Sequence, residues 1–136
     1  MYRFPTEESL TVEFKSDRNC LPDNDIIDAV VAFANTEGGD LYLGIEDDGT
    51  ITGLHPKHRD ITRLTAFIAN KTVPPVSTRA TILHDGQCDV LKLSVPRYTS
   101  IVASAAGKIQ KRRLKADHTP ENVPLYPYEI PQRLSS

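Results

Sequence analysis

Acidic residues in the first third of the chain could bind a divalent metal ion. Glu8 and Glu13 lie on or just before a segment with strand periodicity, and Glu46, Asp47 and Asp48 follow a later strand. Mg²⁺ and Mn²⁺ prefer oxygen ligands, and two or three converging carboxylates can hold such an ion with the water that attacks a phosphodiester. A solvated acidic surface is the alternative for a set of this kind.

Lys15 is the cation nearest to these acids in the strand pattern. It shares a strand face with Glu13, because residues two apart in a strand point to the same side. There it could pair with a carboxylate or offset the charge of a phosphate that is being cleaved.

A second set of residues could bind phosphate groups. Five cations fall within eight residues: Lys108, Lys111, Arg112, Arg113 and Lys115. Contacts from such a cluster to phosphates give salt-dependent binding with little sequence preference. Tyr98, Tyr126 and Tyr128 flank the cluster and could stack on bases or attach the end of the chain to the core. An exposed, solvated hairpin is the alternative for the cations.

The charge is unevenly distributed along the chain. The net charge of −2 argues against a generic nucleic-acid binder. Residues 1–60, however, contain 5 Lys and Arg against 13 Asp and Glu, whereas residues 97–136 contain 7 against 3. Such an asymmetry indicates an anionic partner for the basic end, unless folding brings the two ends together and cancels the field.

Length and composition predict one globular domain without a membrane partner. The 136 residues suffice for one core, and 39% hydrophobic with 25% charged residues is typical of soluble proteins. No signal peptide or membrane span is recognisable, so we expect a cytoplasmic protein. Cys20 and Cys88 form no CxxC pattern and are expected to be reduced thiols. The four histidines have no metal-binding spacing and are interpreted as incidental.

Hydrophobic periodicity and turn residues predict the elements that position these side chains. In chain order they are a strand at 10–15, a helix from 23 or 24 to 34, a hairpin over 40–53 turning at Asp48-Gly49, a helix at 61–68, a hairpin over 76–95 turning at Asp85-Gly86, and a shorter hairpin over 101–114 turning at Gly107. Residues 116–136 are proline-rich and are expected to form an extended tail over the domain.

These elements predict an α+β fold in which two helices pack on a mixed, mainly antiparallel sheet built from hairpins. We expect a single domain over residues 1–136, with a core at about 7–115 and the tail at 116–136.

Several segments in this order resemble the Schlafen AlbA-type DNA-binding domain family. They are Glu8-Ser9-Leu10-Thr11-Val12-Glu13-Phe14-Lys15, Ala32-Phe33-Ala34-Asn35-Thr36 with Gly38-Gly39, Leu43-Gly44-Ile45-Glu46-Asp47-Asp48-Gly49, Ile51-Thr52-Gly53, Val73-Pro74-Pro75, Leu93-Ser94-Val95-Pro96 and the basic stretch around Arg112. The resemblance runs from about Glu7 to Ile130. It implies an α+β fold that binds DNA or RNA, as the N-terminal module of a longer transcriptional regulator, and no cofactor is required for such binding.

The resemblance also implies an alternative function. In the vertebrate Schlafen branch this domain cleaves tRNA and rRNA with three carboxylates and a divalent metal, and the pattern places these carboxylates at Glu8, Glu13 and Asp47. Mg²⁺ or Mn²⁺ would then be the cofactor and Lys15 would assist. Those enzymes clamp RNA between two domains, which a homodimer of this chain could reproduce. A protein-interaction module is the third hypothesis, favoured by the acidic first half of the chain.

Overall fold

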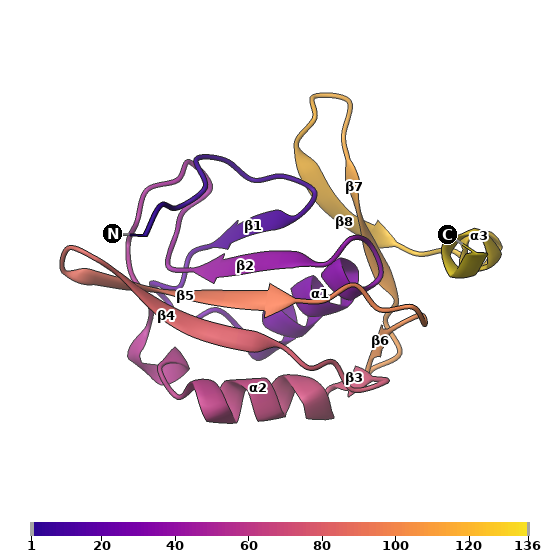
Figure 1. Cartoon of the computed structure of the whole chain (residues 1–136), viewed down its shortest axis with the longest axis horizontal. Helices are drawn as coiled ribbons and strands as arrows, with labels where there is room; N and C mark the ends of the chain where they lie inside the picture. Colours follow the sequence, from indigo (N-terminus) through magenta and orange to yellow (C-terminus); the bar gives the residue numbers. More distant parts are fainter. Residues whose placement is uncertain (1, 136) are drawn as a thin grey trace.

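A four-stranded sheet forms the centre of the protein (Figure 1). The computed structural model describes residues 2–135. β1 (Val12–Lys15) runs parallel to β2 (Gly39–Leu43), and the order β1-β2-β5-β4 is completed by the antiparallel strands β5 (Cys88–Val95) and β4 (Arg79–Asp85). The predicted mixed, mainly antiparallel sheet is therefore confirmed, as is the α+β class.

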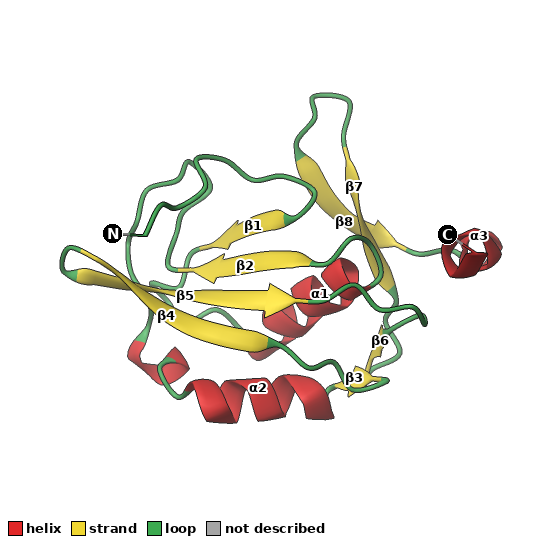
Figure 2. Cartoon of the chain, viewed as in Figure 1, coloured by secondary structure: helices red, strands yellow, loops and turns green. Residues whose placement is uncertain are grey.

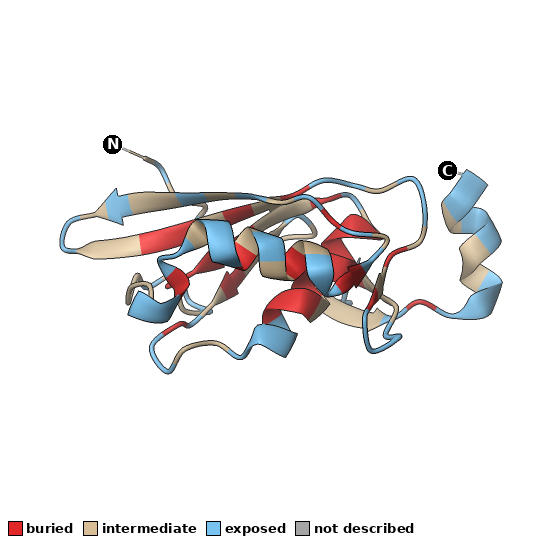
Figure 3. Ribbon diagram, turned by 90° about the horizontal axis from the view of Figure 1, so that it is seen from below, coloured by how far each residue is buried: buried red, intermediate tan, exposed pale blue. Residues whose placement is uncertain are grey.

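Two amphipathic helices supply the main core. α1 (Asp23–Ala34) and α2 (Ile61–Asn70) agree closely with the predicted helices (Figure 2). Their apolar side chains join those of β2 and β5 in one buried cluster. Figure 3 shows the buried residues gathered along α1 and the central strands, whereas the outer side of α2 is largely exposed.

The other face of the sheet carries a smaller apolar cluster. Phe14, Tyr42, Ile45 and Val90 are buried there, and Tyr2 packs against them from the N-terminal end. The hydroxyl groups of Tyr2 and Tyr42 are 2.8 Å apart, within hydrogen-bond distance. Both faces of the sheet are therefore covered by apolar side chains. Phe14 of β1 packs in this smaller cluster, which holds β1 in place from the side opposite to α1.

Glycine makes the tight connection from α1 to β2 possible. Gly38 has a φ of 72°, in the left-handed region, and its N–H donates to Phe33 O over 2.8 Å. A Cβ added to Gly39 would lie 2.5 Å from the Phe33 ring and from Thr11 O. β2, which leads to the acidic turn at Glu46, Asp47 and Asp48, can therefore pack directly on the end of the helix. The hairpin predicted over 40–53 is reduced to β2 and one bridge between Ile45 and Ile51.

Two predictions about the last third of the chain are wrong. β6 (Ala103–Ser104) pairs with β3 (Thr72–Val73), so residues 101–114 form no hairpin of their own. β7 (Gln110–Leu114) pairs instead with β8 (Pro120–Pro124), within the segment predicted to be an extended tail. The two prolines bound β8, where the missing N–H groups do not interrupt the ladder.

The chain ends in further regular structure. A 3₁₀ turn (Pro127–Glu129) leads into α3 (Ile130–Ser135), which stands apart from the central sheet (Figures 1 and 3). Another 3₁₀ turn, Pro56–His58, precedes α2. Among residues 2–135, no helix combines the length and apolar character needed to cross a bilayer.

Candidate functional site

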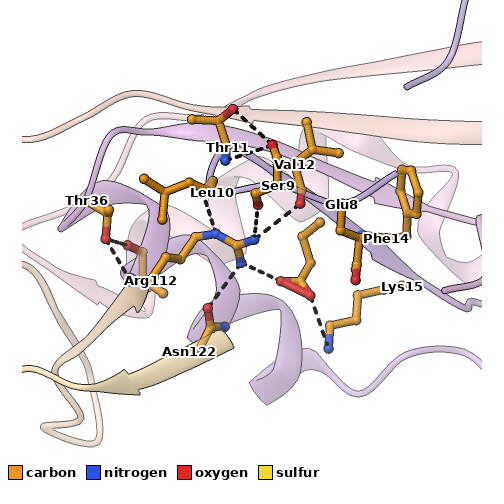
Figure 4. A network of polar contacts seen from close by, with 12 residues as sticks. Glu8, Ser9, Leu10, Thr11, Val12, Phe14, Lys15, Thr36, Arg112 and Asn122 are labelled. Carbon is orange, nitrogen blue, oxygen red and sulfur yellow. Dashed lines mark hydrogen bonds and ion pairs between the residues drawn. The ribbon is translucent and has the colours of Figure 1, made fainter. Parts of the chain in front are cut away.

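Arg112 lies at the junction of the two predicted sets of functional residues. It projects inward from β7, is 2% exposed, and its guanidinium carbon lies 4.4 Å from the centre of the Phe33 ring. Its Nε donates to Leu10 O over 2.7 Å, and its Nη2 donates to Ser9 O over 2.7 Å and to Val12 O over 3.2 Å (Figure 4). One guanidinium thus fixes the turn that leads into β1.

The remaining donors of Arg112 reach side chains. Its Nη1 contacts Glu13 Oε2 in a salt bridge and donates to Asn122 Oδ1 over 3.1 Å. The backbone N–H of Arg112 donates to Thr36 Oγ1 over 2.8 Å. Arg112 was predicted to contact phosphate, but its side chain is buried and fully engaged, so it cannot belong to an exposed phosphate-binding group in this conformation.

The structure brings the three predicted carboxylates into one neighbourhood. Glu8 precedes β1 and accepts a hydrogen bond at Oε1 from the N–H of Phe14 over 2.9 Å. Burial raises the pKa of the Glu8 carboxyl, and the Phe14 N–H partly opposes this shift. The negative charges of Glu13 and Asp47 raise the pKa of Glu8 further. Asp47 itself is exposed.

Lys15 lies beside this group. Its Nζ is 3.9 Å from Glu13 Oε1, as expected from their shared strand face, and its side chain is 37% exposed. Glu13 therefore has a cation on each oxygen: the buried Arg112 on one and the partly exposed Lys15 on the other. The site therefore combines acidic side chains with a partly exposed cation.

The carboxylates as they stand do not form a metal site. Within residues 2–135, no group of three or more His, Cys, Asp and Glu side chains is arranged to hold a metal ion. One oxygen of Glu8 accepts from the backbone and one of Glu13 faces Arg112, so the donor set does not fit an Mg²⁺ or Mn²⁺ ion in this arrangement.

The two other predicted acids stabilise the turn after β2. Glu46 Oε2 accepts from the Thr52 hydroxyl over 2.5 Å, and this bond lowers the pKa of Glu46. Asp48 Oδ1 accepts from the N–H of Thr50 over 2.9 Å, and hydrogen bonds from Thr50 lower its pKa too. Their role is local, and Asp47 is the acid of this turn that acts on Glu8.

The other predicted cations lie on the surface. Lys108 pairs with Asp28 over 3.0 Å, Arg113 pairs with Glu121 over 2.9 Å, and Lys111 contacts Glu129. Lys115 is exposed beside the turn between β7 and β8. Alternation along β7 explains the division, because Lys111 and Arg113 point away from the face that buries Arg112.

Two of the flanking tyrosines form an exposed aromatic pair. The rings of Tyr126 and Tyr128 are stacked, with centroids 6.4 Å apart and planes 8° apart, and they are 54% and 75% exposed. Tyr98 has a structural role, since its hydroxyl donates to Pro75 O and accepts from the N–H of Ser77. The pair lies next to the 3₁₀ turn whose Glu129 contacts Lys111.

A third constellation was missed by the sequence reasoning. His58 was interpreted as incidental, but it is 4% exposed and its Nδ1 lies 2.8 Å and 2.9 Å from the two carboxylate oxygens of the fully buried Asp17. Its Nε2 lies 3.9 Å from Cys20 Sγ. Asp17 and His58 are 41 positions apart, and no periodicity in the sequence joins them.

The family model described as Schlafen, AlbA_2 matches residues 8–120. The crystal structure of the DIP2311 protein from Corynebacterium diphtheriae is similar over 93% of this chain, with a TM-score of 0.74 and 22% identity. This chain covers 24% of that protein's chain.

A second solved structure is similar over a smaller part. It is the N-terminal domain of a RecG-related protein from Nitrosomonas europaea, with 24% identity and a TM-score of 0.46, covering 66% of this chain and 65% of that one. At these identities, the Corynebacterium structure supports the fold.

Proposed function

Because the chain belongs to the Schlafen AlbA_2 family, we propose that it is a nucleic-acid-binding domain whose contact surface is the β7–β8 hairpin. The observation that carries the proposal is the placement of exposed cations and an exposed aromatic pair on one continuous segment. The exposed Lys108, Arg113 and Lys115 lie before, on and after the outer side of β7, and the exposed Tyr126 and Tyr128 follow β8. Cations would hold phosphates, and the tyrosine rings would stack on unpaired bases.

The acids that pair with these cations do not prevent such binding. Arg113 and Glu121 have 58% and 32% of their side chains exposed. An exposed ion pair contributes only about 0–1 kcal/mol, so a phosphate with its higher charge can replace the carboxylate. The hairpin projects beyond the central sheet (Figure 1), which leaves its outer side open to a large ligand. We propose that this domain is the nucleic-acid-binding part of a transcriptional regulator.

Salt-dependent binding tests this proposal. Fluorescence anisotropy with labelled tRNA and labelled single-stranded DNA would be measured over a salt series for the wild type and two variants. The hairpin variant combines Lys108→Ala, Arg113→Ala and Lys115→Ala. The control variant combines Lys57→Ala and Arg63→Ala. We expect the hairpin variant to bind more weakly and to lose about one unit of salt slope per phosphate contact. The control should bind like the wild type. Equal binding by all three proteins would overturn the proposal and favour a protein-interaction module.

A metal-dependent ribonuclease is the second candidate function. One observation favours it: Glu8 is influenced by the charges of both Glu13 and Asp47, so the predicted carboxylates share one neighbourhood. The salt bridge between Arg112 and Glu13 opposes it, because that contact occupies a prospective ligand. Incubating labelled tRNA with Mn²⁺ or with EDTA distinguishes the two candidates. Cleavage that requires Mn²⁺ and disappears in Glu8→Gln would support the ribonuclease, whereas binding without cleavage would support the first proposal alone.

A further inference from the structure

Cys20, His58 and Asp17 form a chain of polar contacts that shares no residue with the predicted acids or the basic hairpin. Cys20 Sγ lies 3.9 Å from His58 Nε2, and His58 Nδ1 lies 2.8 Å from Asp17 Oδ2. We propose that this chain makes Cys20 a reactive thiol that forms mixed disulfides with small anionic disulfides. The inference does not depend on nucleic-acid binding.

The buried carboxylate sets the proton arrangement of the histidine. Asp17 is fully buried and also accepts the N–H groups of Leu21 and His55, each over 2.8 Å. A carboxylate in this position accepts a hydrogen bond, so Nδ1 of His58 carries the hydrogen and Nε2 presents its lone pair to the thiol. These contacts fix the Asp17 carboxylate, and its contact with Nδ1 holds the imidazole with Nε2 directed toward Cys20.

The backbone presents Cys20 in an unusual conformation. Its φ is 59°, in the left-handed region that residues with a side chain seldom adopt. Cys20 is partly exposed, whereas its neighbour His58 is almost completely buried. Reactive cysteines combine partial exposure with a neighbouring imidazole or other cation, and buried structural cysteines do not. Cys88, also partly exposed, provides an internal comparison.

The cleft in front of the thiol indicates which reagent it would accept. A cleft of about 330 Å³ is lined by Cys20 and His58 and also by Lys57, Arg63 and Asp23. Two cations against one carboxylate favour a ligand with net negative charge. The volume suits a small molecule, and Lys57 and Arg63 are both exposed and able to reach it.

The proposed step is a thiol–disulfide exchange. The Cys20 proton moves to His58 Nε2, and the thiolate attacks one sulfur of the disulfide. The new S–S bond forms as the old one breaks, and the departing thiolate takes the proton from His58 Nε2 and leaves as a thiol. Cys20 and one half of the reagent end as a mixed disulfide, while the other half is reduced, so no further oxidant is needed.

Site-resolved mass spectrometry tests the inference. The purified protein would be treated with oxidised glutathione, or with neutral hydroxyethyl disulfide, and modification of Cys20 and Cys88 would be followed over time. We expect Cys20 to react about tenfold faster than Cys88 with oxidised glutathione. His58→Gln should remove this advantage, with circular dichroism confirming that the variant is folded.

A second variant keeps the test decisive if His58→Gln fails to fold. Combining Lys57→Glu with Arg63→Glu changes only exposed side chains, so the fold should persist. This variant should slow the reaction of Cys20 with oxidised glutathione several-fold and leave its reaction with hydroxyethyl disulfide unchanged. Equal rates at Cys20 and Cys88 in the wild type would overturn the reactive thiol. An unchanged rate with oxidised glutathione in the charge-reversed variant would overturn the preference for anions.

Discussion

Arg112 on β7 forms a salt bridge with Glu13 on β1, although 99 residues separate them along the chain. The basic segment and the acidic N-terminal segment are therefore not two independent sites. Arg112, one cation of the basic segment, is buried and paired with Glu13, whereas the other cations of the segment lie at the surface. This salt bridge brings the acidic and basic ends of the chain together, which was one of the two explanations considered for the charge asymmetry.

Replacing Arg112 by alanine should strongly destabilise the protein. The change would leave Glu13 and the carbonyls of Ser9 and Leu10 without their shared donor in a buried place. We expect the free energy of unfolding in urea to fall by about 3–5 kcal/mol. Arg112→Lys should recover only part of it, because an ammonium group cannot reproduce the fork of donors.

Arg113→Ala is the matched control for that experiment. Arg113 is the next residue on β7 but points outward, so its removal should change the free energy of unfolding by no more than about 0.5 kcal/mol. If Arg112→Ala costs as little as Arg113→Ala, the buried guanidinium does not hold β1 in place.

Removing the charge of Glu8 should stabilise the protein at neutral pH. Its pKa is raised in the folded state, mainly by burial, so the folded protein holds this proton more tightly than the unfolded chain. Below the pKa of Glu8 in the unfolded chain, the carboxyl is protonated in both states and does not lower the stability. As the pH rises from that value through the raised pKa of the folded state, the free energy of unfolding falls. Glu8→Gln, which keeps an oxygen for the Phe14 N–H, removes this loss.

Urea unfolding at pH 3 and at pH 7 would measure this effect. We expect Glu8→Gln to match the wild type at pH 3 and to be slightly more stable at pH 7, while Glu7→Gln, an exposed neighbour, serves as the control. A variant less stable than the wild type at pH 7 would show that the charged form of Glu8 is the favoured one.

Periodic apolar residues made much of this fold predictable. α1, α2 and the β4–β5 hairpin follow patterns of 3.6 and 2.0 residues that are visible within about a dozen positions. β8 was not predictable in this way, because its five residues include two prolines and no apolar alternation. Its partner β7 supplies the register, and that information lies outside the segment.

The site was predictable only in part, for a related reason. The neighbourhood of Glu8, Glu13 and Asp47 follows from the resemblance, but the burial of Arg112 contradicts the ordinary expectation that arginine is exposed. Its partners lie up to 103 residues away, at Ser9. The pairing of Asp17 with His58, 41 positions apart, is also non-local, so the sequence alone offers no reason to separate His58 from the other histidines.

Gly39→Ala should be much more harmful than Gly86→Ala. Both positions have positive φ, which costs a residue with a Cβ about 1–3 kcal/mol. A Cβ at Gly39 would also lie 2.5 Å from the Phe33 ring and Thr11 O, whereas one at Gly86 would meet nothing within 4 Å. Overpacking adds about 1–3 kcal/mol at Gly39. Thermal unfolding of both variants would show this difference, and similar melting temperatures would mean that β2 can move away from α1 at little cost.

Tyr128→Ala should weaken binding to single-stranded nucleic acid without affecting the fold. Tyr128 is 75% exposed and stacked on Tyr126, so its ring is available to a base and contributes little to the core. Loss of one base–aromatic stack costs about 1–3 kcal/mol of binding, and Tyr128→Phe should retain it because the ring is kept. Anisotropy with single-stranded DNA and thermal unfolding would be measured for both variants. If Tyr128→Ala instead binds normally and melts earlier, the tyrosine pair attaches the end of the chain to the domain, which is the other role considered for it.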